Sequence, residues 1–184
     1  MKKSYILFLG IITLVGFSAL GFSILYFVSD IRPEQLFIHG CSPFEQTAAG
    51  LAYGLATGFI AWQLLKLGFM QRVKNFYGKM LQDLNFSWLD IVFLSLCAGI
   101  GEEILFRACM QYYAGIWITS IVFIAIHGYL NPKNWRLSIY GLSMTAVIVG
   151  LSYLFEELGM IFAISAHFAI DLFLFGKSEE ERFS

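Results

Sequence analysis

Long runs of apolar residues, separated by short polar breaks, dominate the chain. Six of them predict membrane-spanning helices, at 5–29, 44–70, 90–110, 116–130, 137–155 and 158–175. About 20 apolar residues are needed to cross the ~30 Å hydrocarbon layer as a helix. Turn residues support the breaks between the runs: Arg32-Pro33, Ser42-Pro43, Gly115 and Asn131-Pro132. The pattern therefore predicts an all-α fold, a polytopic transmembrane helix bundle with about six spans.

Composition agrees with a membrane protein. Hydrophobic residues make up 58% of the chain and charged residues 14%, against about 25% charged in an average soluble domain. Six spans occupy most of the 184 residues, so we expect one integral membrane domain over 1–184 and no separate soluble domain. No basic block is long enough to indicate a nucleic-acid partner. The lipid bilayer is the expected surroundings.

The segment 71–89 differs from the spans because polar and apolar residues mix at helical spacing, as in Arg72, Val73, Phe76, Tyr77, Met80, Leu81 and Leu84. This pattern is typical of an amphipathic helix that lies along the membrane interface.

The distribution of basic residues predicts the orientation. With six spans, one side of the membrane receives only Arg32. The other side receives Lys2, Lys3, Lys66, Arg72, Lys74, Lys79, Lys133, Arg136, Lys177 and Arg182. By the positive-inside rule the lysine-rich side is cytoplasmic, with both termini inside. A short chain without an accessory domain favours a prokaryotic inner (cytoplasmic) membrane.

Ionisable residues interrupt three of the apolar runs. Glu102, Glu103 and Arg107 lie in the third run, His127 in the fourth and His167 in the sixth. An ionised side chain near the bilayer midplane costs about 2.5–3.5 kcal/mol on insertion scales. We expect a chain that keeps several such residues to use them together.

Spacing separates the roles of the two glutamates. Glu103 and Arg107 are four residues apart, share a helix face and can form an ion pair. Glu102 is rotated by about 100° from Glu103 and is the poorer partner for the arginine. A desolvated, incompletely paired carboxylate suits a general base near neutral pH. The alternative is a purely structural ion-pair cluster between helices.

The two histidines each have a partner one helical turn away. Phe123 precedes His127 and is read as a packing residue, whereas Asp171 follows His167 and can orient it, fix its tautomer and favour the imidazolium. The predicted span directions bring these groups and the glutamates to one cavity in the cytoplasmic half of the bilayer. Either histidine taken singly could instead only bond a neighbouring backbone carbonyl.

Three motifs in this order resemble a known family, the CPBP group of CAAX prenyl endopeptidases and bacteriocin-processing or immunity relatives, also called Abi proteins. The matching residues are Glu102-Glu103-x-x-x-Arg107, Phe123-x-x-x-His127 and His167-x-x-x-Asp171. The resemblance covers the motif-bearing core, about 90–175. Each motif is short, but three in order, all intramembrane, are together specific.

The resemblance implies a metal-free, glutamic-type intramembrane endopeptidase. It assigns Glu102 and His127 to the activation of water, and His167 and Asp171 to the oxyanion site. The last position is often asparagine in this family and is Asp171 here. An ionised aspartate cannot donate a hydrogen bond to an oxyanion. We therefore predict that Asp171 orients and charges His167, which acts as the donor.

Two other functions compete with this one. A zinc-dependent metallopeptidase could use Glu102, His127 and His167 as ligands, although the chain contains no His-Glu-x-x-His motif. A non-enzymatic immunity or scaffold protein is the second. For an enzyme, the expected substrate is a membrane-associated peptide or protein tail, such as a leader, a sorting tail or a prenylated tail. Nothing in the sequence indicates an oligomeric state.

Two further patterns are read structurally. Gly50, Gly54 and Gly58 form a small-residue face that predicts close helix packing. The three cysteines show no metal-binding spacing and are expected to be unpaired.

Overall fold

The computed structural model describes residues 2–29, 32 and 34–180. The structure does not describe the side chains of 76, 77 and 80–83, which include most of the apolar positions of the predicted interfacial helix. Pro33 and Arg182 also lie outside the described residues. The elements are α1 Lys3–Ile12, η1 Thr13–Phe17, α2 Ser18–Val28, α3 Gln35–Ile38, α4 Pro43–Leu65, η2 Gly68–Met70, α5 Gln71–Leu84, α6 Trp88–Glu103, η3 Ile104–Met110, α7 Gln111–Ile126, α8 Trp135–Leu158 and α9 Met160–Glu180. No strand occurs within these ranges, so the all-α prediction is confirmed.

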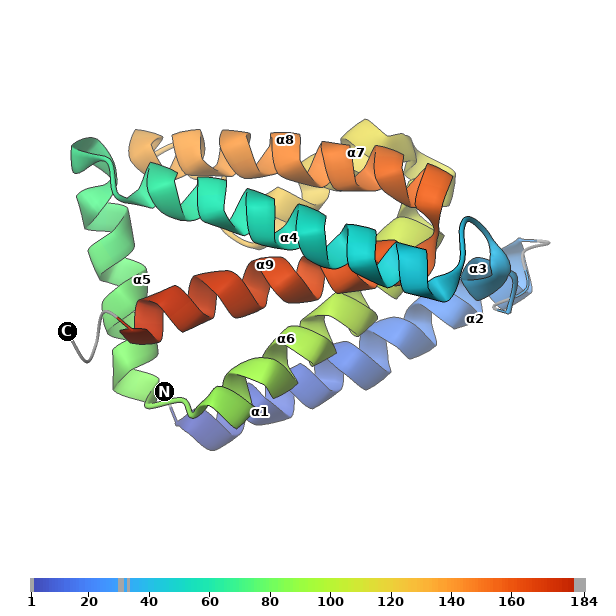
Figure 1. Cartoon of the computed structure of the whole chain (residues 1–184), viewed down its shortest axis with the longest axis horizontal. Helices are drawn as coiled ribbons and strands as arrows, with labels where there is room; N and C mark the ends of the chain where they lie inside the picture. Colours follow the sequence, from blue (N-terminus) through green and yellow to red (C-terminus); the bar gives the residue numbers. More distant parts are fainter. Residues whose placement is uncertain (1, 30–31, 33, 181–184) are drawn as a thin grey trace.

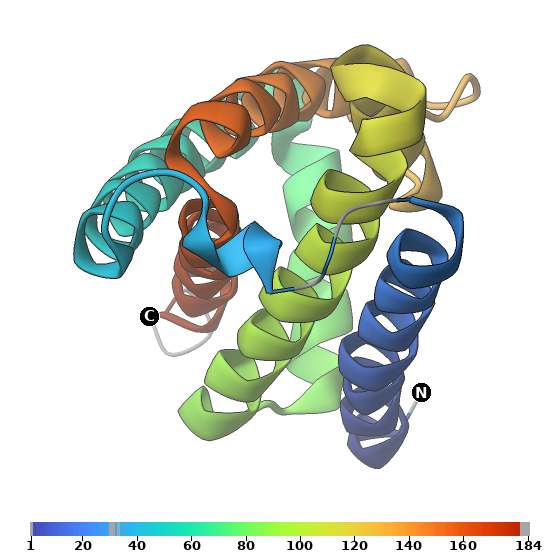
Figure 2. The same ribbon diagram turned by 90° about the vertical axis from the view of Figure 1, so that its right-hand side faces the viewer.

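The helices form a bundle around α9, which lies between α4 and α6 (Figures 1 and 2). The first span, α1 to α2, covers the outer side of α6, and α8 packs beside α4 and α9. Half of the most apolar window of α9 is buried, against 6% for the first span. The first span is therefore a peripheral helix with most of its surface uncovered, whereas α9 is the core of the bundle.

Within the described part of the chain, four helical segments are long and apolar enough to cross a membrane: Lys3–Val28, Pro43–Leu65, Trp135–Leu158 and Met160–Glu180. They coincide with four of the six predicted spans. The span predicted at 90–110 corresponds to α6 and η3, which carry Glu102, Glu103 and Arg107 in the second half of that span. The span predicted at 116–130 is shorter, because α7 ends at Ile126. The span predicted at 44–70 ends as an α-helix at Leu65.

The starts of α4 and α6 follow from local sequence. Ser42 accepts a hydrogen bond from the Glu45 N–H while the Glu45 carboxylate accepts from the Ser42 N–H, and Ser87 and Asp90 repeat this capping box at α6. Each box satisfies backbone donors that have no partner inside the helix. These caps fix the first residues of α4 and of α6, and α6 is the helix that carries the glutamate pair.

Small residues let α4 approach α9 closely, as the glycine pattern predicted. A Cβ on Gly54 would lie 2.3 Å from the Ala166 carbonyl oxygen, and one on Gly50 would lie 2.5 Å from the Phe162 carbonyl oxygen. Both distances are far inside van der Waals contact, so only glycine fits at this separation. The contact fixes the position of α9 and therefore of His167.

The start of α1 and the end of α9 lie at the same end of the bundle, together with α5, which runs across the other helices (Figure 1). The turns after α4 and before α8, which carry Lys66 and Lys133 respectively, lie at this end as well (Figure 1). The arrangement fits an even number of crossings. Which side of the membrane this end faces stays a prediction.

Candidate functional site

The glutamate pair closes the last α-helical turn of α6, where the chain continues into the π-helix η3. Two glycines just before it sit against neighbouring backbones. A Cβ on Gly99 would lie 3.1 Å from the Ile164 carbonyl oxygen in α9, and one on Gly101 would lie 2.3 Å from the Thr13 carbonyl oxygen in η1. The glutamates therefore lie where α6 is held tightly between the core helix and the first span.

Glu103 is the centre of a buried charge cluster. Its side chain and that of Arg107 have no exposed surface, and the Arg107 Nε lies 3.1 Å from Glu103 Oε2. The Arg107 Nη2 donates to Glu103 Oε1 at 3.4 Å. The predicted ion pair is thus formed. Glu103 Oε1 also lies 2.7 Å from His167 Nδ1, which donates to it. Sequence spacing gave no signal for this contact, because the residues are 64 positions apart.

Glu102 faces a different neighbour, in agreement with the predicted rotation away from Arg107. Its Oε2 lies 3.4 Å from the His127 Nε2. His127 Nδ1 lies 2.7 Å from the Phe123 carbonyl oxygen, which can only accept, so Nδ1 carries a hydrogen. In the neutral ring Nε2 is then an acceptor that faces Glu102. The Glu102 side chain is 14% exposed and that of His127 is 30% exposed, whereas Glu102 Oε2 itself is buried against the histidine.

His167 and Asp171 are neighbours, but not in the way the sequence suggested. The His167 Nε2 and Asp171 Oδ2 are 3.7 Å apart, beyond hydrogen-bond distance. The two groups lie within ion-pair distance, but His167 donates no hydrogen bond to Asp171. Glu103 holds the ring through Nδ1 instead, while Asp171 supplies a nearby negative charge on the Nε2 side. Nε2 is left without a hydrogen-bond partner among the described residues.

Phe123 packs at the centre of the motif residues. Its ring lies 4.8 Å from the Arg107 guanidinium carbon, 4.4 Å from the His127 ring and 5.8 Å from the His167 ring. An aromatic face beside a desolvated guanidinium is a favourable cation–π contact. The predicted packing role is consistent with these contacts.

Tyr129 was not singled out by its sequence. Its ring is stacked beside His127, with 6.0 Å between the centroids and 16° between the planes. It follows the helix end at Gly128, where φ is +76°. A tyrosine two residues after a histidine carries no pattern that would have indicated this contact.

Over the described ranges, no group of three His, Cys, Asp or Glu side chains could hold a metal ion. Glu102, His127 and His167 are accordingly not arranged as one ligand set. The three cysteines are free, as expected, and Cys97 and Cys109 are buried.

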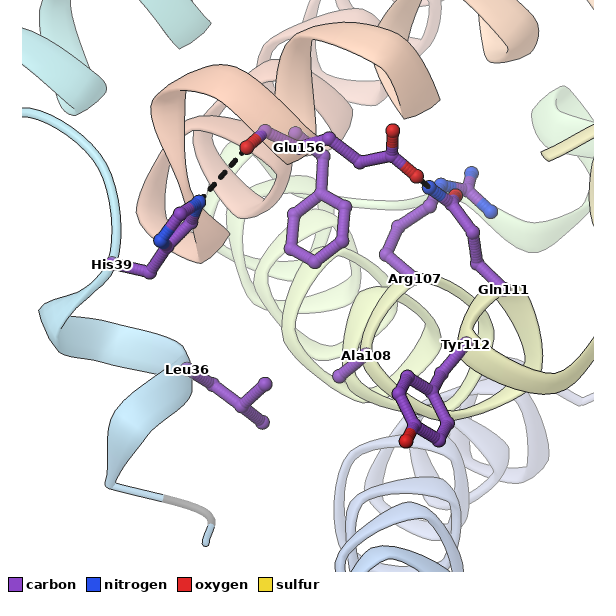
Figure 3. A pocket seen from close by; sticks show the side chains of 8 residues that line it. Leu36, His39, Arg107, Ala108, Gln111, Tyr112 and Glu156 are labelled. Atoms are coloured by element: carbon purple, nitrogen blue, oxygen red, sulfur yellow. Dashed lines mark hydrogen bonds between the residues drawn. The ribbon is translucent and has the colours of Figure 1, made fainter. Parts of the chain in front are cut away.

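A pocket of about 330 Å³ lies next to Arg107, between α3, η3 and the end of α8 (Figure 3). Its lining includes Leu36, His39, Arg107, Ala108, Gln111, Tyr112, Phe155 and Glu156. Gln111 Nε2 donates to Glu156 Oε1 at 3.0 Å, and the His39 Nε2 donates to the Glu156 carbonyl oxygen at 2.9 Å. The pocket contains none of the candidate catalytic residues.

Comparison with known proteins identifies the segment that carries the site. Residues 84–173 match the family model of the type II CAAX prenyl endopeptidase Rce1-like group. One curated relative, "Uncharacterized protein YpbD" of Bacillus subtilis (strain 168), is 39% identical over 82 residues. The aligned part covers 44% of this chain and 41% of the relative, so the chain matches less than half of that protein's length. No solved structure matches.

Proposed function

We propose that the protein is a glutamic-type intramembrane endopeptidase, on the basis of the match of residues 84–173 to the type II CAAX prenyl endopeptidase Rce1-like family. Its substrate would be a membrane-associated peptide or protein tail. The observation that carries the proposal is the pairing of Glu102 with His127. The two residues come from different helices and are partly exposed beside a fully buried Glu103–Arg107 pair.

In the proposed mechanism, Glu102 and His127 position a water molecule. The His127 ring donates through Nδ1 to the Phe123 carbonyl oxygen, so the Nε2 of its neutral form accepts one hydrogen of the water. The Glu102 carboxylate removes the other hydrogen as the water oxygen attacks the scissile carbonyl carbon. A positioned general base of this kind contributes about 10²–10⁴-fold to the rate.

His167 then stabilises the charge that develops on the substrate. Its Nδ1–H donates to Glu103, so in the protonated ring the Nε2–H is free to donate to the oxyanion. Asp171, 3.7 Å from Nε2, favours this protonated ring through its charge. When the carbon–nitrogen bond breaks, the proton on Glu102 passes to the leaving nitrogen, which regenerates the carboxylate and releases an amine and an acid.

Glu103 and Arg107 serve as positioning residues in this scheme. Glu103 orients His167, and Arg107 neutralises Glu103 while its guanidinium packs on Phe123. No step uses a metal, and the zinc-dependent alternative would require Glu102, His127 and His167 to move into one ligand sphere. The site would open to the cytoplasmic half of a prokaryotic inner membrane, with both termini cytoplasmic.

The test is proteolysis in liposomes with short membrane-anchored peptides: leader-like, sorting-tail-like and prenylated. Wild type and Glu157→Gln should cleave the same member of the set, because Glu157 is exposed and lies outside the site. Glu102→Gln should be at least about 100-fold slower while remaining folded. Cleavage by Glu102→Gln at the wild-type rate would refute the assignment of the base. If neither wild type nor control cuts any peptide, the immunity or scaffold alternative is favoured.

A further inference from the structure

A second pocket, of about 400 Å³, lies between α4 and α9 at the end of the bundle that contains the start of α1. It is lined by Phe59, Trp62, Gln63, Lys66, Phe173, Lys177 and Glu180. These residues come from the last turns of α4, the turn that follows it, and the last turns of α9. The volume falls in the range of small-molecule binding sites, about 300–1,000 Å³.

The pocket has an excess of positive charge. The Lys66 Nζ lies 5.9 Å from the centre of the Trp62 ring, and the Lys74 Nζ from α5 lies 4.9 Å from the same ring. Lys177 is paired with Glu180 at 2.5 Å. Lys66 forms no ion pair within the described part of the chain. Two ammonium groups, those of Lys66 and Lys177, thus line a site with the single carboxylate of Glu180.

The rest of the lining is aromatic. Trp62 is buried, whereas the Phe59 ring is about half exposed and lies 6.4 Å from the Phe173 ring across the two helices. Aromatic rings below a layer of lysines are typical of the depth at which a bilayer changes from acyl chains to headgroups. The polar and apolar parts of the pocket are therefore stacked in the same order as those of a phospholipid.

We propose that this pocket binds the phosphate of an anionic phospholipid, with Lys66 and Lys177 as its cationic ligands and the aromatic side chains against the glycerol and upper acyl chain. Basic pockets between transmembrane helices at this depth suit such headgroups. The proposal does not depend on peptidase activity, since none of these residues takes part in the proposed reaction.

Occupation of the pocket would tie α4 to α9 at the end of the bundle. A Cβ added at Gly58 would already lie 3.1 Å from Phe173 Cβ, so the two helices are in close contact just beside the pocket. A ligand that bridges Lys66 on one side and Lys177 on the other would resist their separation. It would also stabilise α9, the helix that carries His167 and Asp171.

The test is a titration of the purified full chain in neutral detergent micelles. The lipids are phosphatidylglycerol and phosphatidylcholine, with glycerol phosphate as the soluble source of the same phosphate group. The readouts are the unfolding temperature and native mass spectrometry of the bound lipid. Phosphatidylglycerol should bind saturably and raise the unfolding temperature, and phosphatidylcholine should not. Glycerol phosphate that binds as tightly as the lipid would support the phosphate site but identify a soluble ligand.

Matched variants distinguish a binding role from a structural one. Lys66→Gln and Lys177→Gln should each weaken phosphatidylglycerol binding about fivefold, with unchanged stability in neutral detergent. Lys133→Gln, an exposed lysine in the turn before α8, should bind like wild type. Glu180→Gln should strengthen binding, because it removes the competing carboxylate. Equal affinity for the two lipids, or equal affinity of wild type and the double lysine variant, would overturn the proposal.

Discussion

Removing Arg107 should destabilise the protein because it breaks a completely buried ion pair. Both Arg107 and Glu103 have 0% exposed side-chain surface, and they approach each other to 3.1 Å. Removing one partner of such a pair typically costs about 3–5 kcal/mol, since the other charge stays buried and uncompensated. We expect Arg107→Met, which keeps most of the volume, to cost about 3 kcal/mol, the lower end of that range. His167 remains as a partner for Glu103 in this variant.

Glu103→Gln should lower the free energy of unfolding more than Arg107→Met does, by about 4–5 kcal/mol. It leaves the Arg107 guanidinium without a carboxylate in contact, and an amide N–H₂ would face another donor. The double variant with Arg107→Met should be less destabilised than the sum of the two, because neither member of the Glu103–Arg107 pair is then left as a buried charge without the other. The three values together isolate the energy of the pair from the volume change.

The measurement is reversible unfolding by SDS titration in neutral detergent, followed by circular dichroism. Lys177→Met, in the exposed pair with Glu180, is the control and should cost less than about 1 kcal/mol. If Arg107→Met cost no more than this control, a buried ion pair between α6 and η3 would be refuted.

Three further outcomes are expected. Gly54→Ala should separate α4 from α9 and lower the unfolding temperature, because its Cβ would lie 2.3 Å from the Ala166 carbonyl oxygen. The control Gly68→Ala adds a Cβ that meets nothing within 4 Å and should leave the unfolding temperature unchanged. Equal effects of the two substitutions would contradict this packing. Asp171→Asn should lower kcat with the fold retained, measured as initial cleavage rates, and an unchanged kcat would make its charge irrelevant. A metal chelator should leave the cleavage rate unchanged, and inhibition reversed by zinc would favour the metallopeptidase.

The hydrophobic runs predicted most of the helices of the bundle, because every helix that spans the bilayer needs about the same length of apolar sequence. The runs at 5–29 and 137–155 became helices within a few residues of the prediction. The predicted end of the fourth span, at 130, lies beyond the observed helix end at Ile126. The chain turns at Gly128, and the apolar pattern gives no sign of this turn. The turn at Gly115, by contrast, was visible, and its φ of +75° explains why a glycine is found there.

The site was predictable only as far as helical spacing reaches. The Glu103–Arg107 pair follows from positions four apart. The contact of Glu103 with His167 does not, because it depends on how closely α6 approaches α9, and the packing of small residues such as Gly99 sets that distance. The same reason explains why Asp171 was assigned an orienting hydrogen bond that Glu103 makes instead.

The π-helix Ile104–Met110 has a consequence for how chains of this kind can differ in length. A π-helical turn accommodates one residue more than an α-helical turn and leaves the flanking helices nearly in line. Loss of a single residue within this segment would therefore convert it to a regular α-helix without rotating α6 against the helix that follows. Insertions or deletions elsewhere in the core would turn the glutamates away from the histidines. A one-residue gap at this position is the length change that the core can best absorb over evolution.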